Sequence, residues 1–172
     1  MKSLLTLLLT IILISCGATA SYDYDTETNF SKYKTYDFYP NISSGLSDLD
    51  NIRIIKYTDS ILQLQGFKKS DSPQFLINFF AKEFVSQSNT VIGFGVGSGG
   101  HNGSVGVSGG VPVGGDIINQ KLTFDFIDEK EDKLFWQAVG TDELKVKASP
   151  SQKDSYYFEL ISKILKGFPP KK

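Results

Sequence analysis

Cysteine, histidine, methionine and tryptophan each occur once in the 172 residues, and neither sign of charge dominates. One cysteine excludes an intramolecular disulfide framework, and one histidine leaves little material for metal binding or acid–base catalysis. The 18 Lys and Arg residues against 19 Asp and Glu give a formal net charge of −1. No basic run of the kind that binds nucleic acid is present. The composition, 40% hydrophobic and 13% aromatic, is typical of one globular domain.

No apolar run reaches the roughly 20 residues that span a bilayer. The run from Leu4 to Ile14 has the length of the hydrophobic region of a signal peptide, and Lys2 supplies the positive charge before it. It ends in Leu13-Ile14-Ser15-Cys16, which resembles the lipobox of bacterial lipoproteins. The resemblance implies cleavage between Ser15 and Cys16 and acylation of the Cys16 thiol. The alternative is an ordinary secretory signal with a cysteine near its cleavage site by chance.

The lipobox also predicts where the protein resides. Residues 1–15 are then the signal peptide, residues 16–21 form a lipidated N-terminus with a short tether, and residues 22–172 form the domain. Gly17 stands where an aspartate retains enteric lipoproteins in the inner membrane, and no acidic cluster follows Cys16. We therefore expect an outer-membrane protein that faces the periplasm and is attached to the membrane by its N-terminal lipid.

Aromatic residues are concentrated at the start of the domain, with seven between Tyr22 and Tyr39. The segments Tyr22–Asp25 and Tyr33–Tyr39 are rich in strand-forming residues and are predicted as β-strands. Their aromatic side chains fit the buried and half-buried faces of a sheet. A ligand-stacking platform is the alternative interpretation.

Two segments show the pattern of amphipathic helices. The first, residues 47–66, has cap candidates in Ser47 and Asp48 and a stop signal in Gly66. Its predicted apolar stripe consists of Leu49, Ile52, Ile55, Ile61, Leu62 and Leu64. The second helix, residues 151–167, is predicted to be capped by Ser151. Its stripe consists of Tyr157, Leu160, Ile161, Ile164 and Leu165.

Three further segments predict long strands: Gln74–Val85, Gln120–Asp128 and Leu134–Thr141. The first has apolar residues on both faces and is predicted to be central and covered on both sides. The acidic turn between the other two lacks the pattern of a calcium-binding loop. The order of elements predicts an α+β fold, a mostly antiparallel sheet with two helices packed on it and a glycine-rich β-hairpin.

Eleven glycines lie in residues 93–115 and create two misleading motifs. Gly95–Gly100 matches the dinucleotide-binding pattern, which requires a helix directly after it, whereas more glycines follow here. Gly106–Gly110 matches the nucleophile elbow of serine hydrolases, which requires a histidine downstream. The only histidine, His101, lies upstream, so the second motif is rejected as well as the first. A lone histidine is not predicted to bind a metal.

The same segment instead alternates apolar residues with glycine on both sides of Asn102-Gly103, a favoured hairpin turn. It predicts a β-hairpin with one nearly bare face. Four glycines are candidate interaction residues on it: Gly95, Gly97, Gly106 and Gly110. A disordered loop and a ligand-binding segment remain alternatives, because glycine loses the most backbone entropy on ordering.

Several motifs together are similar to those of the family called domain of unknown function 4136, which consists of bacterial lipoproteins. They begin with Asp23-Tyr24-Asp25 and the segment Phe30–Tyr36. They continue with Gly66-Phe67, the Pro73–Phe79 strand and Trp136-Gln137-Ala138. The resemblance implies an envelope lipoprotein with no established activity, cofactor or catalytic residues, so it assigns no site residue.

Two classes of function fit these observations. The favoured one is a non-enzymatic module, anchored by lipid, that binds an envelope protein, peptidoglycan or a small amphiphile and no nucleic acid. The alternative is an envelope hydrolase that uses Asp23, Asp25 or Asp125 for acid–base chemistry. No cofactor or metal is predicted for either function.

Overall fold

The computed structural model describes residues 18–86, 91–96, 107–112 and 115–171. The signal peptide, Ser15, Cys16 and the predicted hairpin turn lie outside the described residues. No helix within the described ranges is long and apolar enough to cross a bilayer.

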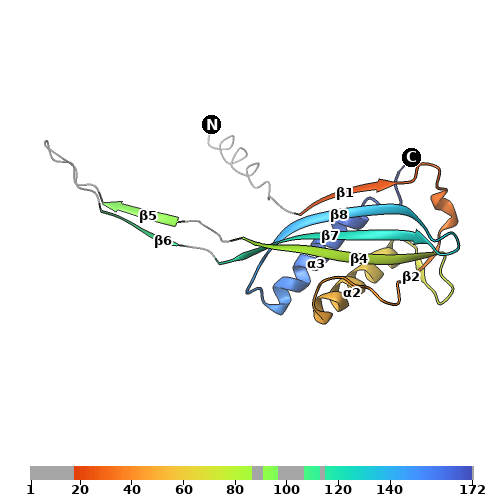
Figure 1. The fold of residues 1–172 in the computed structure, drawn as a ribbon, viewed down its shortest axis with the longest axis horizontal. Helices are drawn as coiled ribbons and strands as arrows, with labels where there is room; N and C mark the ends of the chain where they lie inside the picture. The colour runs from red at the N-terminus through yellow and green to blue at the C-terminus, as the bar shows by residue number, and fades with distance from the viewer. Residues whose placement is uncertain (1–17, 87–90, 97–106, 113–114, 172) are drawn as a thin grey trace, which may run out of the picture.

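A six-stranded sheet forms one layer, and two helices packed side by side form the other (Figure 1). The strand order is β1-β8-β7-β4-β2-β3. The strands are β1 (Thr19–Tyr24), β2 (Thr35–Phe38), β3 (Lys68–Lys69), β4 (Phe75–Ser86), β7 (Ile117–Asp128) and β8 (Lys133–Lys145). Strand β2 is parallel to β3 and β4, and every other pairing of this sheet is antiparallel. The predicted α+β class with a mostly antiparallel sheet is confirmed.

Strands β4, β7 and β8 form the centre of the molecule. Their alternate residues are buried against the helices, as the period of two predicts. Phe79 of β4 and Phe124 of β7 are paired in register, and their ring centroids lie 5.7 Å apart. This face of the sheet supplies most of the hydrophobic core.

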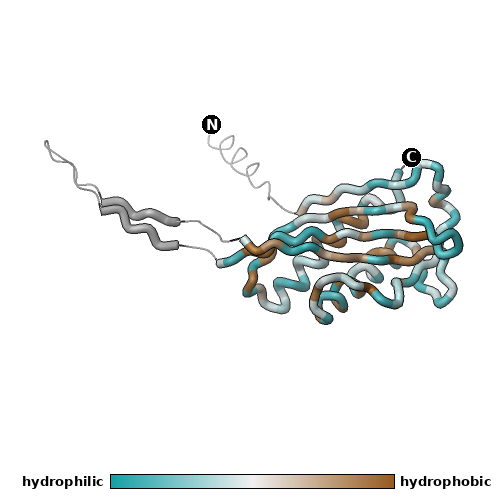
Figure 2. The backbone as a smooth tube through the Cα atoms, viewed as in Figure 1, coloured by the Kyte–Doolittle hydropathy of each residue, from teal (hydrophilic) through white to brown (hydrophobic). Residues whose placement is uncertain are grey.

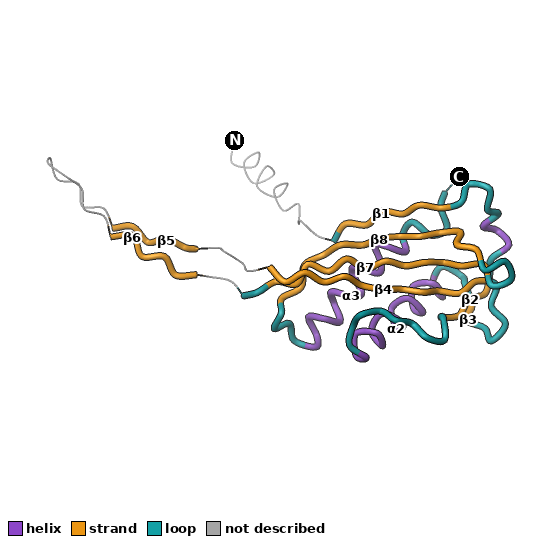
Figure 3. Tube along the Cα trace, in the orientation of Figure 1, coloured by secondary structure: helices purple, strands orange, loops and turns teal. Residues whose placement is uncertain are grey.

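The opposite face of β4 differs from the prediction that both faces are covered. Leu76 and Phe80 are half-buried, and the Phe84 side chain is 64% exposed. Both described helices lie on the same side of the sheet, so nothing among the described elements covers the other side (Figure 3). The strand is central, but its second face is open.

Both helices begin at a capped residue. Helix α2 spans Asp48–Leu64, and the Ser47 side chain accepts a hydrogen bond from the Asp50 amide. Gly66, with φ +93°, ends the helical segment as predicted. Helix α3 spans Pro150–Leu165 and starts with a capping box between Ser149 and Gln152. The cap is therefore Ser149, not the predicted Ser151.

The buried stripe of α2 was predicted only in part, since Leu62 is buried and Ile55 and Ile61 pack half-buried against the core. The buried residues are Asp50, Ile54, Thr58 and Leu62, whereas Leu49, Ile52 and Leu64 are exposed. Arg53, predicted to face solvent, is instead mostly buried and bonded to Asp50 and to Asp154 of α3. A second helix beside α2 provides polar partners, which is why a polar face is buried. The α3 stripe is confirmed, with Tyr156 added to it.

Strands β1 and β3 also differ from the predictions. Strand β1 starts at Thr19, inside the segment predicted as tether, and the Thr19 and Thr141 hydroxyls are 2.7 Å apart. Strand β3 was not predicted, because two exposed lysines carry no apolar alternation. A short 3-10 helix, η1 (Phe30–Lys32), joins β1 to β2.

An aromatic cluster fills the core at the end of the sheet where α3 finishes. Phe168, just after α3, lies at its centre and is 3% exposed. Its ring centroid is 4.6 Å from that of Phe126 and 5.1 Å from that of Trp136. It also contacts the rings of Phe30, Phe67, Phe75 and Phe135.

The glycine-rich segment contains the predicted pair of strands, β5 (Val91–Val96) and β6 (Val107–Pro112). They are antiparallel, with Val96 opposite Val107 and Gly95 opposite Ser108. Among the described elements, β5 and β6 contact only each other. Figure 1 shows this β5–β6 ribbon beyond the ends of β4 and β7 and away from the helices.

The corrected face of α2 generates a prediction with an internal control. Leu62→Ala should lower the free energy of unfolding by about 2–5 kcal/mol, because the side chain is fully buried. Leu64→Ala, two residues away and 86% exposed, should change it by less than about 0.5 kcal/mol. Urea unfolding of both variants measures the difference. Equal effects would show that the helix face is still misassigned.

Candidate functional site

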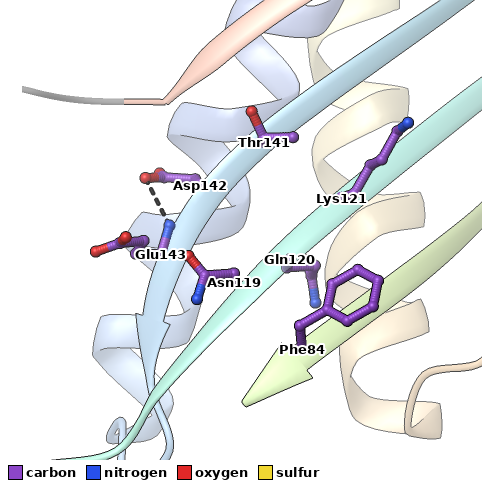
Figure 4. Close-up of a pocket in the computed structure, with 7 residues that line it drawn as sticks. All are labelled: Phe84, Asn119, Gln120, Lys121, Thr141, Asp142 and Glu143. Carbon is purple, nitrogen blue, oxygen red and sulfur yellow. Dashed lines mark hydrogen bonds between the residues drawn. The ribbon is translucent and has the colours of Figure 1, made fainter. Parts of the chain in front are cut away.

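The open face of the sheet is hollowed at the end from which the ribbon continues. The hollow has a volume of about 670 Å³. Its lining comes from three neighbouring strands and consists of Phe84, Asn119, Gln120, Lys121, Thr141, Asp142 and Glu143 (Figure 4). The register places Phe84, Asn119 and Glu143 in one row across β4, β7 and β8. Helix α3 lies on the other side of these strands, where the Tyr156 and Tyr157 hydroxyls lie within hydrogen-bond distance of Gln120.

The lining suits non-covalent binding. Phe84 offers an aromatic ring, and Asn119 and Thr141 offer hydrogen-bonding groups. In Figure 4 the Lys121 amine points away from Asp142 and Glu143, so the charged groups do not converge on one point. Sequence analysis did not single out this set, because an exposed Phe84 cannot be distinguished by alternation from a buried one.

The edge of β4 beside the hollow is also exposed. The Ala81 amide donates a hydrogen bond of 2.8 Å to the Ser44 carbonyl, so the loop before α2 covers the edge of β4 as far as Ala81. From Lys82 to Ser86, β4 pairs with β7 and with no other described strand. We call Lys82–Ser86 the open edge. Phe84 and Val85 within it are 64% and 68% exposed, and Figure 2 shows hydrophobic residues at this end of the sheet.

The four predicted interaction glycines fall in two groups. Gly95 lies in β5 and Gly110 in β6, opposite Ser108 and Gly93 respectively. This register places the small residues on a common face, as the alternation predicts. Gly97 and Gly106 lie outside the described residues. Pairing of the strands is thus confirmed, and an interaction role of these glycines stays a prediction.

The three candidate catalytic carboxylates are engaged in different bonds. Asp25 forms an ion pair with Lys133 at 2.6 Å, and Asp125 accepts a hydrogen bond from Gln137 at 2.7 Å. Asp23 accepts a hydrogen bond from the Tyr24 amide. Asp23 and Asp25 share a shallow hollow of about 260 Å³ with Gln137, whereas Asp125 does not line it. The Lys133 ammonium lowers the pKa of Asp25, opposite to what a general acid near neutral pH requires.

The buried carboxylate of Asp50 is also held in its charged form. Burial would raise the pKa of Asp50, but Lys153, Ser47 and Arg53 together lower it. The ion pairs Lys153–Asp50 and Arg53–Asp154 join α2 to α3. In the described part of the chain, no three His, Cys, Asp or Glu side chains are grouped so that they hold a metal ion.

Asp128 closes the hairpin between β7 and β8. Its carboxylate accepts hydrogen bonds of 2.8 Å from the Lys32 ammonium and the Tyr33 hydroxyl. It also accepts bonds from the Lys130 and Glu131 amides. Although burial opposes ionisation, these donors hold the Asp128 pKa well below its usual range. Burial raises the pKa of Tyr33 to about 12, so its hydroxyl remains a donor. The Asp128 carboxylate therefore connects η1 to the turn between β7 and β8.

Comparison with known proteins gives a family and a fold. The model of the family DUF4136, a domain of unknown function, matches residues 20–170. That description indicates no enzymatic family. No curated protein sequence matches the chain.

The solved structures that resemble the chain are distant in sequence. A PDZ domain protein from Parabacteroides distasonis has a TM-score of 0.56 at 13% identity, covering 99% of this chain. The chain spans 41% of that protein's length. A PelC variant dodecamer from Paraburkholderia phytofirmans has a TM-score of 0.53 at 12% identity, covering 90% of this chain and 99% of that one. At such identities the likeness concerns the fold alone.

The bonds to Asp128 generate a pH-dependent prediction. Asp128→Asn should lower the free energy of unfolding by about 1.5–3 kcal/mol at pH 7, since hydrogen bonds to a charged acceptor are lost. A folded-state pKa below the unfolded value stabilises the protein above about pH 4 and ceases to do so as pH falls through the folded pKa. The gap between wild type and variant in urea unfolding should therefore narrow from pH 7 to about pH 3.

A control at the open face completes this experiment. Asp125→Asn removes a carboxylate that is not buried and should change stability by less than about 0.5 kcal/mol. A gap for Asp128→Asn that is equally large at both pH values would contradict the assigned role of its charge.

Proposed function

The chain belongs to the DUF4136 family, and from this premise we propose that it is a lipid-anchored envelope protein that works by binding and assembly instead of catalysis. The observation that carries the proposal is the β5–β6 ribbon. It contacts no other described element, and in the chain it follows β4, which carries the open edge, and precedes β7. A two-stranded ribbon is marginally stable alone, so a partner that pairs with it or covers it would stabilise it.

The anchor is supported by the position of Cys16 relative to the sheet. The lipobox Leu13–Cys16 precedes β1 directly, and β1 starts at Thr19. A lipid on Cys16 would hold the domain close to the membrane surface, because only two residues separate Cys16 from the start of β1. Several acyl chains on one cysteine would give stable attachment. With Gly17 next to the cysteine, we propose the periplasmic face of the outer membrane as its location.

The binding role is supported by the open edge and the hollow beside it. Unpaired backbone groups at Lys82–Ser86 are able to accept a further strand, and the exposed Phe84 and Val85 side chains add apolar surface. PelC of similar fold is a dodecamer. We therefore place a second copy of this chain first among the partners to measure, ahead of another envelope protein, peptidoglycan or a small amphiphile.

The anchor is tested by Cys16→Ala. The variant should remain an uncleaved or poorly cleaved precursor without diacylglyceryl lipid, because the acceptor thiol is gone. Mass spectrometry of the wild-type and variant proteins from the membrane fraction measures both cleavage and lipid. An unmodified Cys16 thiol in the mature wild-type chain would refute the anchor.

The binding surface is tested by the double variant Phe84→Ser/Val85→Ser. Both side chains are exposed, so we expect folding to change by less than about 0.5 kcal/mol per residue. Loss of their apolar area should abolish the assembly that light scattering measures for the detergent-extracted wild-type protein. It should also abolish cross-linked adducts formed in whole cells.

A matched control is available on α2, where Leu49 and Ile52 are 65% and 59% exposed. Leu49→Ser/Ile52→Ser removes similar apolar area from another surface and should leave assembly and adducts unchanged. Equal loss in both double variants would show a general solubility effect. Retention in both would contradict a role for the open edge.

A further inference from the structure

A lysine-lined surface lies beside β1, close to the point where the described chain begins. Lys163, Lys166 and Lys171 surround a hollow of about 370 Å³. The remaining lining consists of Ala20, Tyr22, Gly167 and Pro169. All three lysines are exposed, and within the described ranges no carboxylate lies within ion-pair distance of them. We call this set of residues the lysine surface.

Aromatic packing fixes this surface in place. The Tyr22 ring lies so close to Gly167 that a Cβ there would collide with it. Tyr22 also stacks on the buried Trp136, with ring centroids 6.3 Å apart, and Trp136 packs on Phe168. The chain after α3 is therefore held against β1, and Lys166 and Lys171 in this chain lie near Lys163 at the end of α3.

The charge of this surface differs from that of the whole protein. Residues 160–171 contain three lysines and no acid, and residues 17–22 contain no charged side chain. The entire chain, in contrast, has a formal net charge of −1. Positive charge is thus concentrated where α3 ends, and its complement is an anionic surface.

The same surface lies next to the proposed anchor. Ala18 is the first described residue, and two further residues lead back to Cys16. Even fully extended, the two steps from Cys16 to Ala18 span about 7 Å. Lipid headgroups around an acylated Cys16 would therefore lie within reach of the lysine surface. The half-exposed Tyr22 ring, with its polar hydroxyl, is of the type that favours a membrane interface.

We propose that the lysine surface docks on the phosphate groups of anionic phospholipids in the leaflet that holds the anchor. The proposal rests on the proposed lipid anchoring and adds an orientation to it. With α3 and β1 against the headgroups, the domain has a fixed side toward the membrane. Each lysine near an anionic bilayer strengthens such binding about fivefold, and salt weakens it.

The test uses the lipidated mature protein in two kinds of vesicle. One contains phosphatidylcholine alone, and the other contains about one-third phosphatidylglycerol, which supplies the anionic surface. Amide hydrogen exchange should slow in residues 18–24 and 160–171 with the anionic vesicles alone. Salt at about 1 M, where the Debye length is roughly 3 Å, should reverse the protection.

Charge-matched variants identify the residues responsible. Lys163→Glu/Lys166→Glu/Lys171→Glu should lose the protection. Lys34→Glu/Lys56→Glu/Lys147→Glu, which changes three exposed lysines outside the lysine surface, the hollow and the open edge, should retain it. Equal protection in both vesicles, or equal loss in both variants, would overturn the proposal.

Two further outcomes are separated by the same samples. Protection that appears in native membranes but not in anionic vesicles would overturn the proposal in favour of an acidic protein partner. The mass of the chain recovered from the vesicles reports acylation of Cys16 independently. Failure of the anchor and failure of the lysine surface are therefore distinguishable.

Discussion

The packing of the Phe168 ring is the contact on which most of this architecture depends. Its six aromatic neighbours come from η1, the segment after α2, and strands β4, β7 and β8. Phe168 lies three residues after the end of α3, and its single ring contacts all of these segments, so it joins the helix layer to the sheet. Trp136 extends the cluster to Tyr22, and so to the edge strand β1. The core is thus linked physically to the surface beside the proposed anchor.

Much of the fold was predictable because its signals are local. Alternation identified the central strands, and caps and stop residues identified both helices to within a few residues. The polar part of the buried face of α2 was not predictable. Asp50 is buried because Lys153, about a hundred residues later, neutralises it, and no local pattern reveals that partner. A hydrophobic stripe identifies the buried face only where burial is apolar.

The candidate surfaces also divide into those predictable from a local pattern and those that depend on distant segments of the chain. The alternation of glycine with apolar residues predicted the pairing of β5 and β6, since register is set within one hairpin. The hollow beside Phe84 depends instead on side chains that three strands bring into adjacent rows, which is a property of the assembled sheet. The lysine surface likewise needs β1 and the end of α3 side by side, although they are separated by most of the chain. Acidic residues were easy to nominate as catalytic, but their lysine and glutamine partners became visible only in the fold.

The ribbon is inserted between two strands that are neighbours in the sheet, and this determines which end of the domain it leaves from. Strand β4 leads out to β5, β6 leads back into β7, and β4 and β7 share an unbroken antiparallel ladder from Phe75–Asp128 to Ser86–Ile117. The register aligns Thr19, the first residue of β1, with Thr141, Lys121 and Lys82 on the three following strands. Lys82 is four residues from the end of β4, so β1 starts at the same end of the sheet from which the ribbon continues. An anchor before β1 and a partner on the ribbon would therefore meet the domain at one end, and the turn between β7 and β8 would lie at the far end.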